Sequence, residues 1–254
     1  MHHPLALEAG LSIQQANILR TCERAALIAA RLVIANSTET ARHLARDYGV
    51  AADRIVIACP GTDPAPIAQG SRDGIVRLIS VGALVPRKGF DVLVAALATL
   101  AELPWQLTIV GDRGRDPQTA ARLDADISRL KLADRVKVVG AVPAESLAEL
   151  YADADVFALA SRFEGYGMAF SEAIARGLPV IGTTAGAIPE TVPAEAGLLV
   201  PPDDVPALAE ALRRVIANPD ERCRMAAAAR AAASTLPTWR DSGKLFADAL
   251  ETVA

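Results

Sequence analysis

The stretch VRLISVGALVPRKGFDVLVAAL, residues 76–97, decides the fold. Its first six residues are mostly β-branched or aliphatic and predict a buried strand. After a short turn with glycine, proline and two basic residues, apolar side chains recur with helical spacing at Phe90, Leu93, Val94 and Leu97. A strand that runs through a short turn into an amphipathic helix is the repeating unit of a parallel sheet.

The same alternation continues toward the carboxyl terminus. Helical spacing returns at Val205, Leu208, Leu212 and Ile216. Because strands and helices alternate, we expect a doubly wound, Rossmann-like α/β domain with a parallel sheet over residues 70–254. The six expected strands are VRLISV, WQLTIV, RVKVVG, VFALA, PVIG and GLLVP.

Residues 1–69 contain fewer expected strands than an independent domain needs. Two strands alone do not make a stable sheet domain, so we interpret this segment as the tail of another α/β domain. Residues 69–74 are polar and turn-forming and are the predicted linker. The segment is expected to contain helices at residues 12–30 and 39–48 and strands at residues 32–37 and 54–58.

Composition excludes several classes of protein. The formal net charge is −4, from 26 Lys plus Arg and 30 Asp plus Glu, which argues against nucleic acid as the main partner. Hydrophobic residues make up 52% of the chain, but no apolar run is long enough to span a bilayer. The amino terminus lacks the basic residues of a secretory signal, so we expect a cytoplasmic protein. Cys22, Cys59 and Cys223 are too scattered for a disulfide framework or a zinc site.

Two loops are expected to form the ligand site. In a doubly wound sheet, ligands bind beyond the carboxyl ends of the strands, where the strand order reverses. The rule selects residues 82–89, after the first strand, and residues 161–167, after the fourth. Arg87 and Lys88 precede a helix, whose amino terminus carries unpaired N–H donors, so these residues are suited to a diphosphate. A solvated basic turn is the alternative.

Two carboxylates accompany the second loop. Glu164 and Glu172 are eight residues apart, close to two helical turns. If the helix begins near Met168, Glu172 is directed toward the crevice that Glu164 borders. A carboxylate there can accept hydrogen bonds from the paired hydroxyls of a ribose or hexose. The alternative is that both are surface carboxylates.

These loops also carry a family resemblance. The runs ISVGALVPRKGFDVLVAAL, VKVVGAVPAESLAELYADADVFALAS and FEGYGMAFSEAIARGLPVIGTTAGAIPE resemble the donor domain of retaining glycosyltransferases of family 4, which have the GT-B fold. The signature is Glu164 and Glu172 together with the turn at Lys88 and Gly89. The resemblance implies an acceptor-domain remnant at residues 1–69, a donor-binding Rossmann-like domain at residues 70–237, and a crossing helix at residues 238–254.

The resemblance also implies roles for individual residues. Lys88, helped by Arg87, would hold the donor diphosphate and stabilise charge on the leaving nucleoside diphosphate. Glu164 would lie near the transferred sugar, and Glu172 would bind the ribose. Many members carry Arg where this chain has Ala83, so that phosphate contact is either missing or has moved to Arg87. Val139 and Val142 would flank the base, and Gly82 is a further donor-binding candidate. Backbone N–H groups would line the sugar and phosphate pocket, from Gly165, Gly167, Met168, Ala169 and Phe170.

The function implied is transfer of a hexose from UDP-sugar or GDP-sugar to an acceptor hydroxyl, with retention of the anomeric configuration. The acceptor is a sugar, a lipid-linked molecule or a small molecule, which leaves peripheral membrane contact open. No cofactor is expected, and no metal, because Asp112 is a single carboxylate without clustered partners.

Three histidines and one further glutamate are also considered. His2 and His3 lie in a stretch that resembles the place where the family has an acceptor-side histidine, and the alternative is a tag-like terminus. His43 is interpreted as a surface residue and Glu190 as a structural helix cap.

Three other functions are considered. The chain could be a non-catalytic nucleotide-sugar-binding module, or a donor subunit that needs a separate acceptor chain, because most of the acceptor domain is absent. A sugar-nucleotide epimerase, which shares the fold, is a less favoured alternative. A nicotinamide-dependent dehydrogenase is set aside, because VGALVPRKG lacks the G-x-G-x-x-G spacing.

Overall fold

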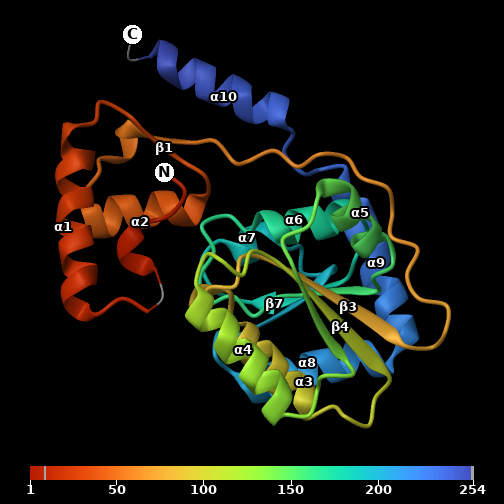
Figure 1. Ribbon diagram of the computed structural model, residues 1–254. Helices are drawn as coiled ribbons and strands as arrows, with labels where there is room; N and C mark the ends of the chain where they lie inside the picture. The colour runs from red at the N-terminus through yellow and green to blue at the C-terminus, as the bar shows by residue number, and fades with distance from the viewer. Residues whose placement is uncertain (9, 253–254) are drawn as a thin grey trace.

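The computed structural model describes residues 1–8 and 10–252 (Figure 1). Within these residues the strands form a large sheet and a small one, both parallel. The large sheet has the strand order β5-β4-β3-β6-β7-β8, which is the doubly wound order expected from the sequence. Its strands are β3 (Val76–Val81), β4 (Trp105–Val110), β5 (Val136–Gly140), β6 (Val156–Ala158), β7 (Val180–Thr183) and β8 (Gly197–Val200).

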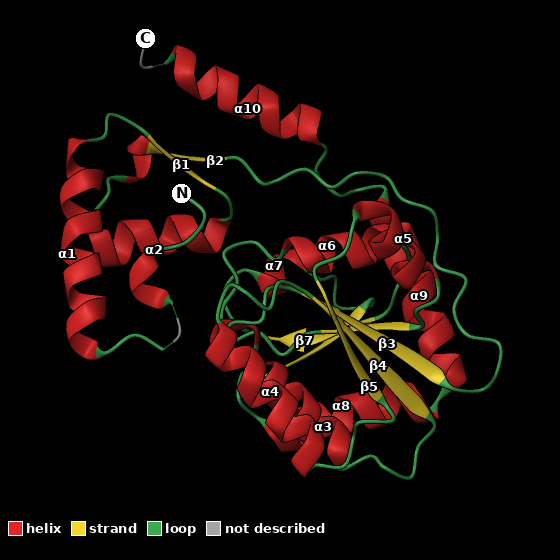
Figure 2. Cartoon of the chain, in the orientation of Figure 1, coloured by secondary structure: helices red, strands yellow, loops and turns green. Residues whose placement is uncertain are grey.

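Helices cover both faces of this sheet (Figure 2). On one face lie α3 (Phe90–Ala98), α4 (Pro117–Arg129) and α8 (Val205–Ala217). On the other lie α5 (Ala144–Ala152), α6 (Met168–Ala175) and α9 (Pro219–Ala233), with the short α7 (Ile188–Thr191) at the end of α6. One continuous apolar core fills the space between the layers.

Local sequence explains where these helices begin. Asp116 caps α4 by accepting a hydrogen bond from the Thr119 N–H at 3.0 Å, and Asp204 caps α8 through the Ala207 N–H at 2.9 Å. Both caps are followed by proline in the first turn, where the missing N–H costs nothing. Helix α6 begins at Met168, as expected.

The amino-terminal part is a smaller layer beside the large sheet. It consists of η1 (Leu5–Leu7), α1 (Ile13–Ala29), β1 (Val33–Ala35), α2 (Thr38–Tyr48), η2 (Ala52–Arg54) and β2 (Ile55–Ile57). Strands β1 and β2 pair in parallel with each other, and a separate apolar cluster lies between them and the helices.

The chain crosses between the two parts twice. Residues 58–75 run from β2 to β3 without helix or strand, and the last helix, α10 (Trp239–Glu251), returns alongside this crossing (Figure 1). The Thr62 N–H donates to the Pro237 carbonyl at 2.8 Å, and a Cβ on Gly61 would lie only 2.1 Å from the Trp239 nitrogen. The two crossings therefore touch, and Gly61 permits the contact.

The predicted linker is tied to the large domain. The N–H groups of Gln69 and Gly70 both donate to the Ala152 carbonyl, and the Ser71 N–H donates to Asp155 at 2.9 Å. No helix in the described part of the chain is both long and apolar enough to cross a bilayer.

Candidate functional site

The two loops selected from the sequence meet at the switch point of the sheet. They follow β3 and β6, which are neighbours in the sheet although three α-helices and two strands separate them in sequence. Gly89 has a φ of +63°, and a Cβ there would lie 1.9 Å from the Ala160 carbonyl oxygen. The Arg162 N–H also donates to the Arg87 carbonyl at 2.8 Å. Glycine at this position therefore lets the basic turn η3 (Pro86–Lys88) pack directly on the end of β6.

Lys88 and Glu164 form a buried ion pair between these loops. The Lys88 ammonium lies 2.6 Å from Glu164 Oε1, and the side chains are only 14% and 7% exposed. The Ser161 hydroxyl donates to the same oxygen at 2.6 Å. The stem of Lys88 lies against Gly82, where a Cβ would be 3.0 Å from Lys88 Cε.

Opposing effects act on the protonation of Glu164. Burial alone would raise the pKa of this carboxyl, because a charged group is costly away from water. The Lys88 ammonium, the hydrogen bonds from Lys88 and Ser161, and the Arg87 guanidinium outweigh burial, so the pKa lies below the ordinary value. Glu164 is therefore a carboxylate at neutral pH.

Arg87 is held on three sides. Its Nη1 donates to the Phe163 carbonyl at 2.8 Å and to Glu164 Oε2 at 3.3 Å, and its Nε donates to Glu8 Oε1 at 3.3 Å. Its side chain is 15% exposed. The cations expected to bind a diphosphate are therefore brought together, each beside a carboxylate.

The amino-terminal residues lie directly on the second loop. A Cβ on Gly165 would be 2.0 Å from the His2 carbonyl oxygen and 3.2 Å from His3 Cβ. The His3 ring lies 6.0 Å from that of Phe163, and its Nε2 is 2.8 Å from Glu8 Oε2. His3 is thus an ordered part of the site's wall, while His2 contributes its backbone.

Glu172 has a different set of partners from Glu164. Its carboxylate accepts a hydrogen bond from the Tyr151 hydroxyl at 3.4 Å. Burial is the main influence and raises the pKa of Glu172 in spite of the nearby Arg176 guanidinium. A half-buried carboxylate with one long hydrogen bond can accept further hydrogen bonds from ligand hydroxyls.

The other predicted donor-binding residues lie at or just beyond the end of β5 and at the start of α6. Gly167 has a φ of +93° and leads into α6, whose first N–H groups have no partner within the helix. Val139 and Val142, at the end of β5, are partly buried against the core. The ring of Phe170 is fully buried against Phe157, and its N–H donates to the Gly167 carbonyl at 2.9 Å.

Sequence reasoning missed Glu8 and Ser161 as members of this cluster. Glu8 lies 79 residues from Arg87 in the chain, and a single glutamate outside any motif gives no local signal. Ser161 could have been found, because it is the first residue after the fourth strand and lies three residues before Glu164.

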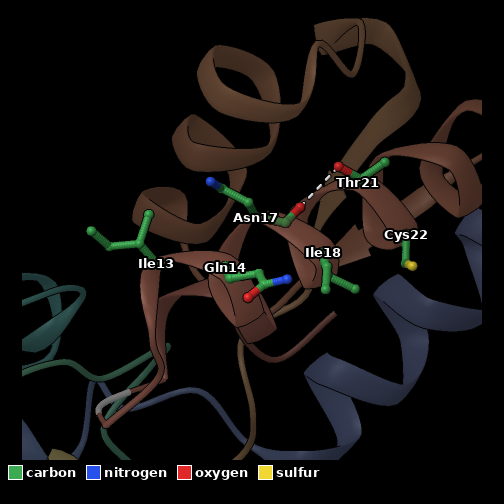
Figure 3. Close-up of a pocket in the computed structure, with 6 residues that line it drawn as sticks. All are labelled: Ile13, Gln14, Asn17, Ile18, Thr21 and Cys22. Carbon is green, nitrogen blue, oxygen red and sulfur yellow. Dashed lines mark hydrogen bonds between the residues drawn. The ribbon is translucent and has the colours of Figure 1, made fainter.

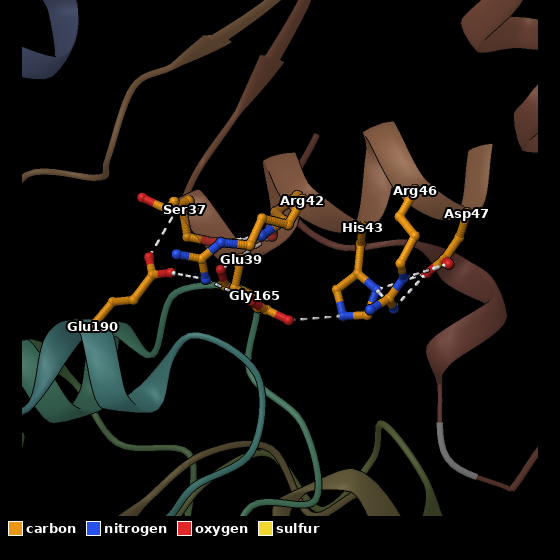
Figure 4. Close-up of polar contacts among 10 residues, drawn as sticks. Ser37, Glu39, Arg42, His43, Arg46, Asp47, Gly165 and Glu190 are labelled. Atoms are coloured by element: carbon orange, nitrogen blue, oxygen red, sulfur yellow. Dashed lines mark hydrogen bonds and ion pairs between the residues drawn. The ribbon is translucent and has the colours of Figure 1, made fainter. Parts of the chain in front are cut away.

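Helix α2 joins the amino-terminal part to the same region (Figure 4). The Thr38 N–H donates to Glu190 Oε2 at 3.0 Å, and Arg42 lies 3.3 Å from Glu190 Oε1. Glu190 thus helps to cap a helix, although one from the other part of the chain. His43, interpreted as a surface residue, is only 15% exposed, because it packs edge-on to Phe163 and bonds to Asp47 at 2.9 Å.

Several cavities in the described part of the chain lie outside the switch point, and two of them border the amino-terminal part. The first, of about 630 Å³, is an open depression along α1 lined by Ile13, Gln14, Asn17, Ile18, Thr21 and Cys22 (Figure 3). The second, of about 250 Å³, lies between the amino terminus, β1 and α10, and includes His2, Met168, Trp239 and Phe246. Among residues 1–8 and 10–252, no cluster of three or more His, Cys, Asp or Glu side chains could hold a metal ion.

Comparison with known proteins identifies the family of the chain and several relatives. Residues 66–232 match the family Glycosyl transferases group 1. A GDP-mannose-dependent monoacylated alpha-(1-6)-phosphatidylinositol monomannoside mannosyltransferase of Corynebacterium glutamicum is 36% identical over 178 residues, covering 66% of this chain and 45% of the relative. A D-inositol 3-phosphate glycosyltransferase of Xylanimonas cellulosilytica is 32% identical, covering 83% of this chain and 54% of the relative. The chain spans about half the length of these curated relatives.

Solved structures agree on the fold. Sucrose-phosphate synthase of Thermosynechococcus elongatus superposes with a TM-score of 0.84 at 28% identity, over 96% of this chain and 64% of that one. Anabaena Alr3699/HepE in complex with UDP-glucose gives a TM-score of 0.82 at 23% identity, over 99% and 71%. The expected GT-B type of α/β fold is confirmed.

Proposed function

Because the chain belongs to the Glycosyl transferases group 1 family, we propose that it binds a nucleotide-diphosphate sugar at the switch point and serves the transfer of the hexose to an acceptor hydroxyl, with retention of configuration. The observation that carries the proposal is the convergence of Lys88, Arg87 and Glu164 between the ends of β3 and β6. This is the place where doubly wound sheets bind their ligands.

In this proposal the chemistry is mainly electrostatic. Breaking the bond between the sugar and the diphosphate leaves negative charge on the phosphate, and Lys88 and Arg87 stabilise that charge as it develops. Glu164 keeps both cations in place, since it bonds to each of them. The reaction takes place on one face of the sugar, with the donor phosphate accepting the proton of the acceptor hydroxyl. It requires no metal or other cofactor.

Glu172 is proposed to accept hydrogen bonds from the ribose hydroxyls. Burial makes its charged form costly, and Tyr151 offers only a long hydrogen bond of 3.4 Å. Ribose hydroxyls would supply the missing donors. Val139 and Val142 are proposed to flank the base, and the first N–H groups of α6 to face the sugar and phosphates.

The names of relatives narrow the choice of substrates. One relative depends on GDP-mannose, and one structural neighbour was solved with UDP-glucose. We therefore keep UDP and GDP as the candidate nucleotides. The relatives' acceptors include a phosphatidylinositol mannoside and an inositol phosphate, so a polyol or sugar hydroxyl, free or lipid-linked, is the proposed acceptor class. We place the reaction in the cytoplasm, at the membrane surface when the acceptor is a lipid.

A second candidate is a donor-binding unit that acts only together with further acceptor-binding structure. It is favoured by the small β1–β2 sheet, which has too few strands to form a domain alone, and by the half-length match to the relatives. Transfer to an acceptor by the isolated chain would exclude it. An epimerase would instead convert the donor sugar without any acceptor.

Calorimetric titration with UDP, GDP, ADP and NAD tests the proposal. The expected result is selective binding of UDP or GDP, weakened by Lys88→Ala and by Glu172→Gln. Lys244→Ala, on the exposed surface of α10, is the matched control and should bind like the wild type. Equal binding of all four ligands, or none by a folded chain, contradicts the proposal.

A further inference from the structure

Glu8 connects the two groups of residues around the site. One carboxylate oxygen accepts from Arg87 Nε at 3.3 Å, and the other lies 2.8 Å from His3 Nε2. The contacts continue through Arg87 to Glu164 and from there to Lys88. A single side chain from the amino-terminal part thus reaches the proposed phosphate-binding cations.

The charge of Glu8 is well defined. The hydrogen bond with His3 is the largest influence, and with the positive charge of Arg87 it outweighs burial and lowers the pKa of Glu8 to about 2. Glu8 is about one-third exposed and is a carboxylate throughout the physiological range. It therefore acts on Arg87 as a permanent anionic acceptor.

The contacts of Arg87 leave a specific part of the guanidinium available. An arginine carries five N–H donors in a fixed plane. Nε is taken by Glu8, and Nη1 is shared by the Phe163 carbonyl and Glu164. Three acceptors from two parts of the chain fix the plane of the group. Among residues 1–8 and 10–252 no acceptor contacts Nη2, so its donors can serve a ligand. Phosphate oxygens are well matched to such a group.

We propose that Glu8 is a positioning residue of the donor site: it fixes the Arg87 guanidinium so that Nη2 meets the donor diphosphate, and it links that cation to His3. The inference rests on the proposed function and extends it to a residue outside the donor domain. It also accounts for Ala83, because a fixed Arg87 can supply the phosphate contact that Ala83 cannot.

Two physical effects of Glu8 predict opposite changes in diphosphate binding when its charge is removed. A carboxylate near a phosphate repels it, so if Glu8 were only a neighbouring charge, its removal would strengthen diphosphate binding. If Glu8 positions Arg87, its removal frees a long side chain that must be ordered again on binding, which weakens binding by about threefold to tenfold. The sign of the change therefore distinguishes a positioning role from a passive one.

The experiment measures the dissociation constants of UDP and GDP for the full chain by calorimetry, in the wild type, Glu8→Gln, Arg87→Ala and the double variant. We expect Glu8→Gln to weaken binding in the wild type and to have no effect once Arg87 is alanine, because Glu8 acts through Arg87. Uridine and guanosine, which lack phosphates, should bind equally to the wild type and Glu8→Gln. Glu8→Asp should not restore the affinity fully, since it is one methylene shorter.

Glu23→Gln is the matched control. Glu23 accepts from the Leu5 N–H at 2.8 Å and from the Tyr48 hydroxyl at 2.9 Å, so it holds the same amino-terminal segment without touching the cations. If Glu23→Gln weakens binding as much as Glu8→Gln, Glu8 acts only by anchoring the segment, and the inference is overturned. Unchanged or tighter binding by Glu8→Gln also overturns it, while leaving the proposed function intact. Failure of the folded wild type to bind UDP or GDP overturns both.

Discussion

Lys88 Nζ and Glu164 Oε1 lie 2.6 Å apart, with both side chains almost completely shielded from water. The pair joins the loop after β3 to the loop after β6, and each group makes the burial of the other tolerable. Removing one member of a buried pair is much more costly than replacing both, because the remaining charge has lost its partner.

Lys88→Met should therefore destabilise the fold by about 3 kcal/mol, as measured by urea unfolding at pH 7. Lys88→Met combined with Glu164→Gln should recover much of the loss, since no unpaired charge remains. The pH dependence follows from the lowered pKa of Glu164. Its stabilising contribution is present above the unfolded value of about 4.3 and is lost as the pH falls through the lower, folded value. If Lys88→Met alone were as stable as the wild type, the ion pair between Lys88 and Glu164 would not form in solution.

Gly89 and Gly140 allow steric overlap to be separated from backbone strain. Both have positive φ, +63° and +77°, but a Cβ on Gly89 would lie 1.9 Å from the Ala160 carbonyl, whereas one on Gly140 would meet nothing within 4 Å. Gly140→Ala should cost about 1–2 kcal/mol from strain alone, and Gly89→Ala more than about 3 kcal/mol. If the two variants lost the same free energy of unfolding in thermal denaturation, the loops after β3 and β6 could separate without penalty.

The fold could be predicted from the sequence because the spacing of apolar residues distinguishes its strands from its helices clearly. The runs at residues 76–81 and 105–110 became β3 and β4 with the predicted bounds, and the switch point lies between β3 and β6 as the doubly wound order requires. The fourth strand was predicted at residues 156–160, but it ends at Ala158. Strand ends depend on where the partner strand stops, and this is not encoded locally.

The site was only partly predictable. The expectation that Arg87, Lys88 and Glu164 lie together needed only the rule about strand ends, and the structure brings these side chains into contact. The contacts of Glu8, Thr38 and Glu190 join segments far apart in the chain. Such pairs depend on how the amino-terminal part packs against the large domain, and the spacing of apolar residues in the sequence does not indicate this packing.

Glu190 should stabilise the contact between the amino-terminal part and α7. Glu190→Ala removes the acceptor of the Thr38 N–H and a partner of Arg42. We expect amide exchange at Thr38 to become about fivefold faster, corresponding to the loss of a hydrogen bond worth about 1 kcal/mol. Glu195→Ala, at an exposed position nearby in sequence, is the control and should leave this amide unchanged. Unchanged exchange in Glu190→Ala would mean that α2 does not use Glu190 in solution.

Glu172 should show the opposite pH dependence to Glu164. Its pKa is raised, mainly by burial, so the folded state binds its proton more tightly than the unfolded state does. The penalty for the charged form is absent below the unfolded value of about 4.3 and develops as the pH rises through the folded value. Glu172→Gln should therefore stabilise the chain by about 0.5–1 kcal/mol at pH 7 and by almost nothing at pH 4.

The comparison that checks this uses urea unfolding at both pH values, with Glu149→Gln on the exposed face of α5 as the control. A gain in Glu172→Gln that is the same at both pH values would show that the charge of Glu172 is not the cause. The same substitution should weaken nucleotide binding, because an amide oxygen is a poorer acceptor for ribose hydroxyls than a carboxylate. A variant that is more stable but binds less tightly would identify Glu172 as a residue whose buried charge is kept for the ligand.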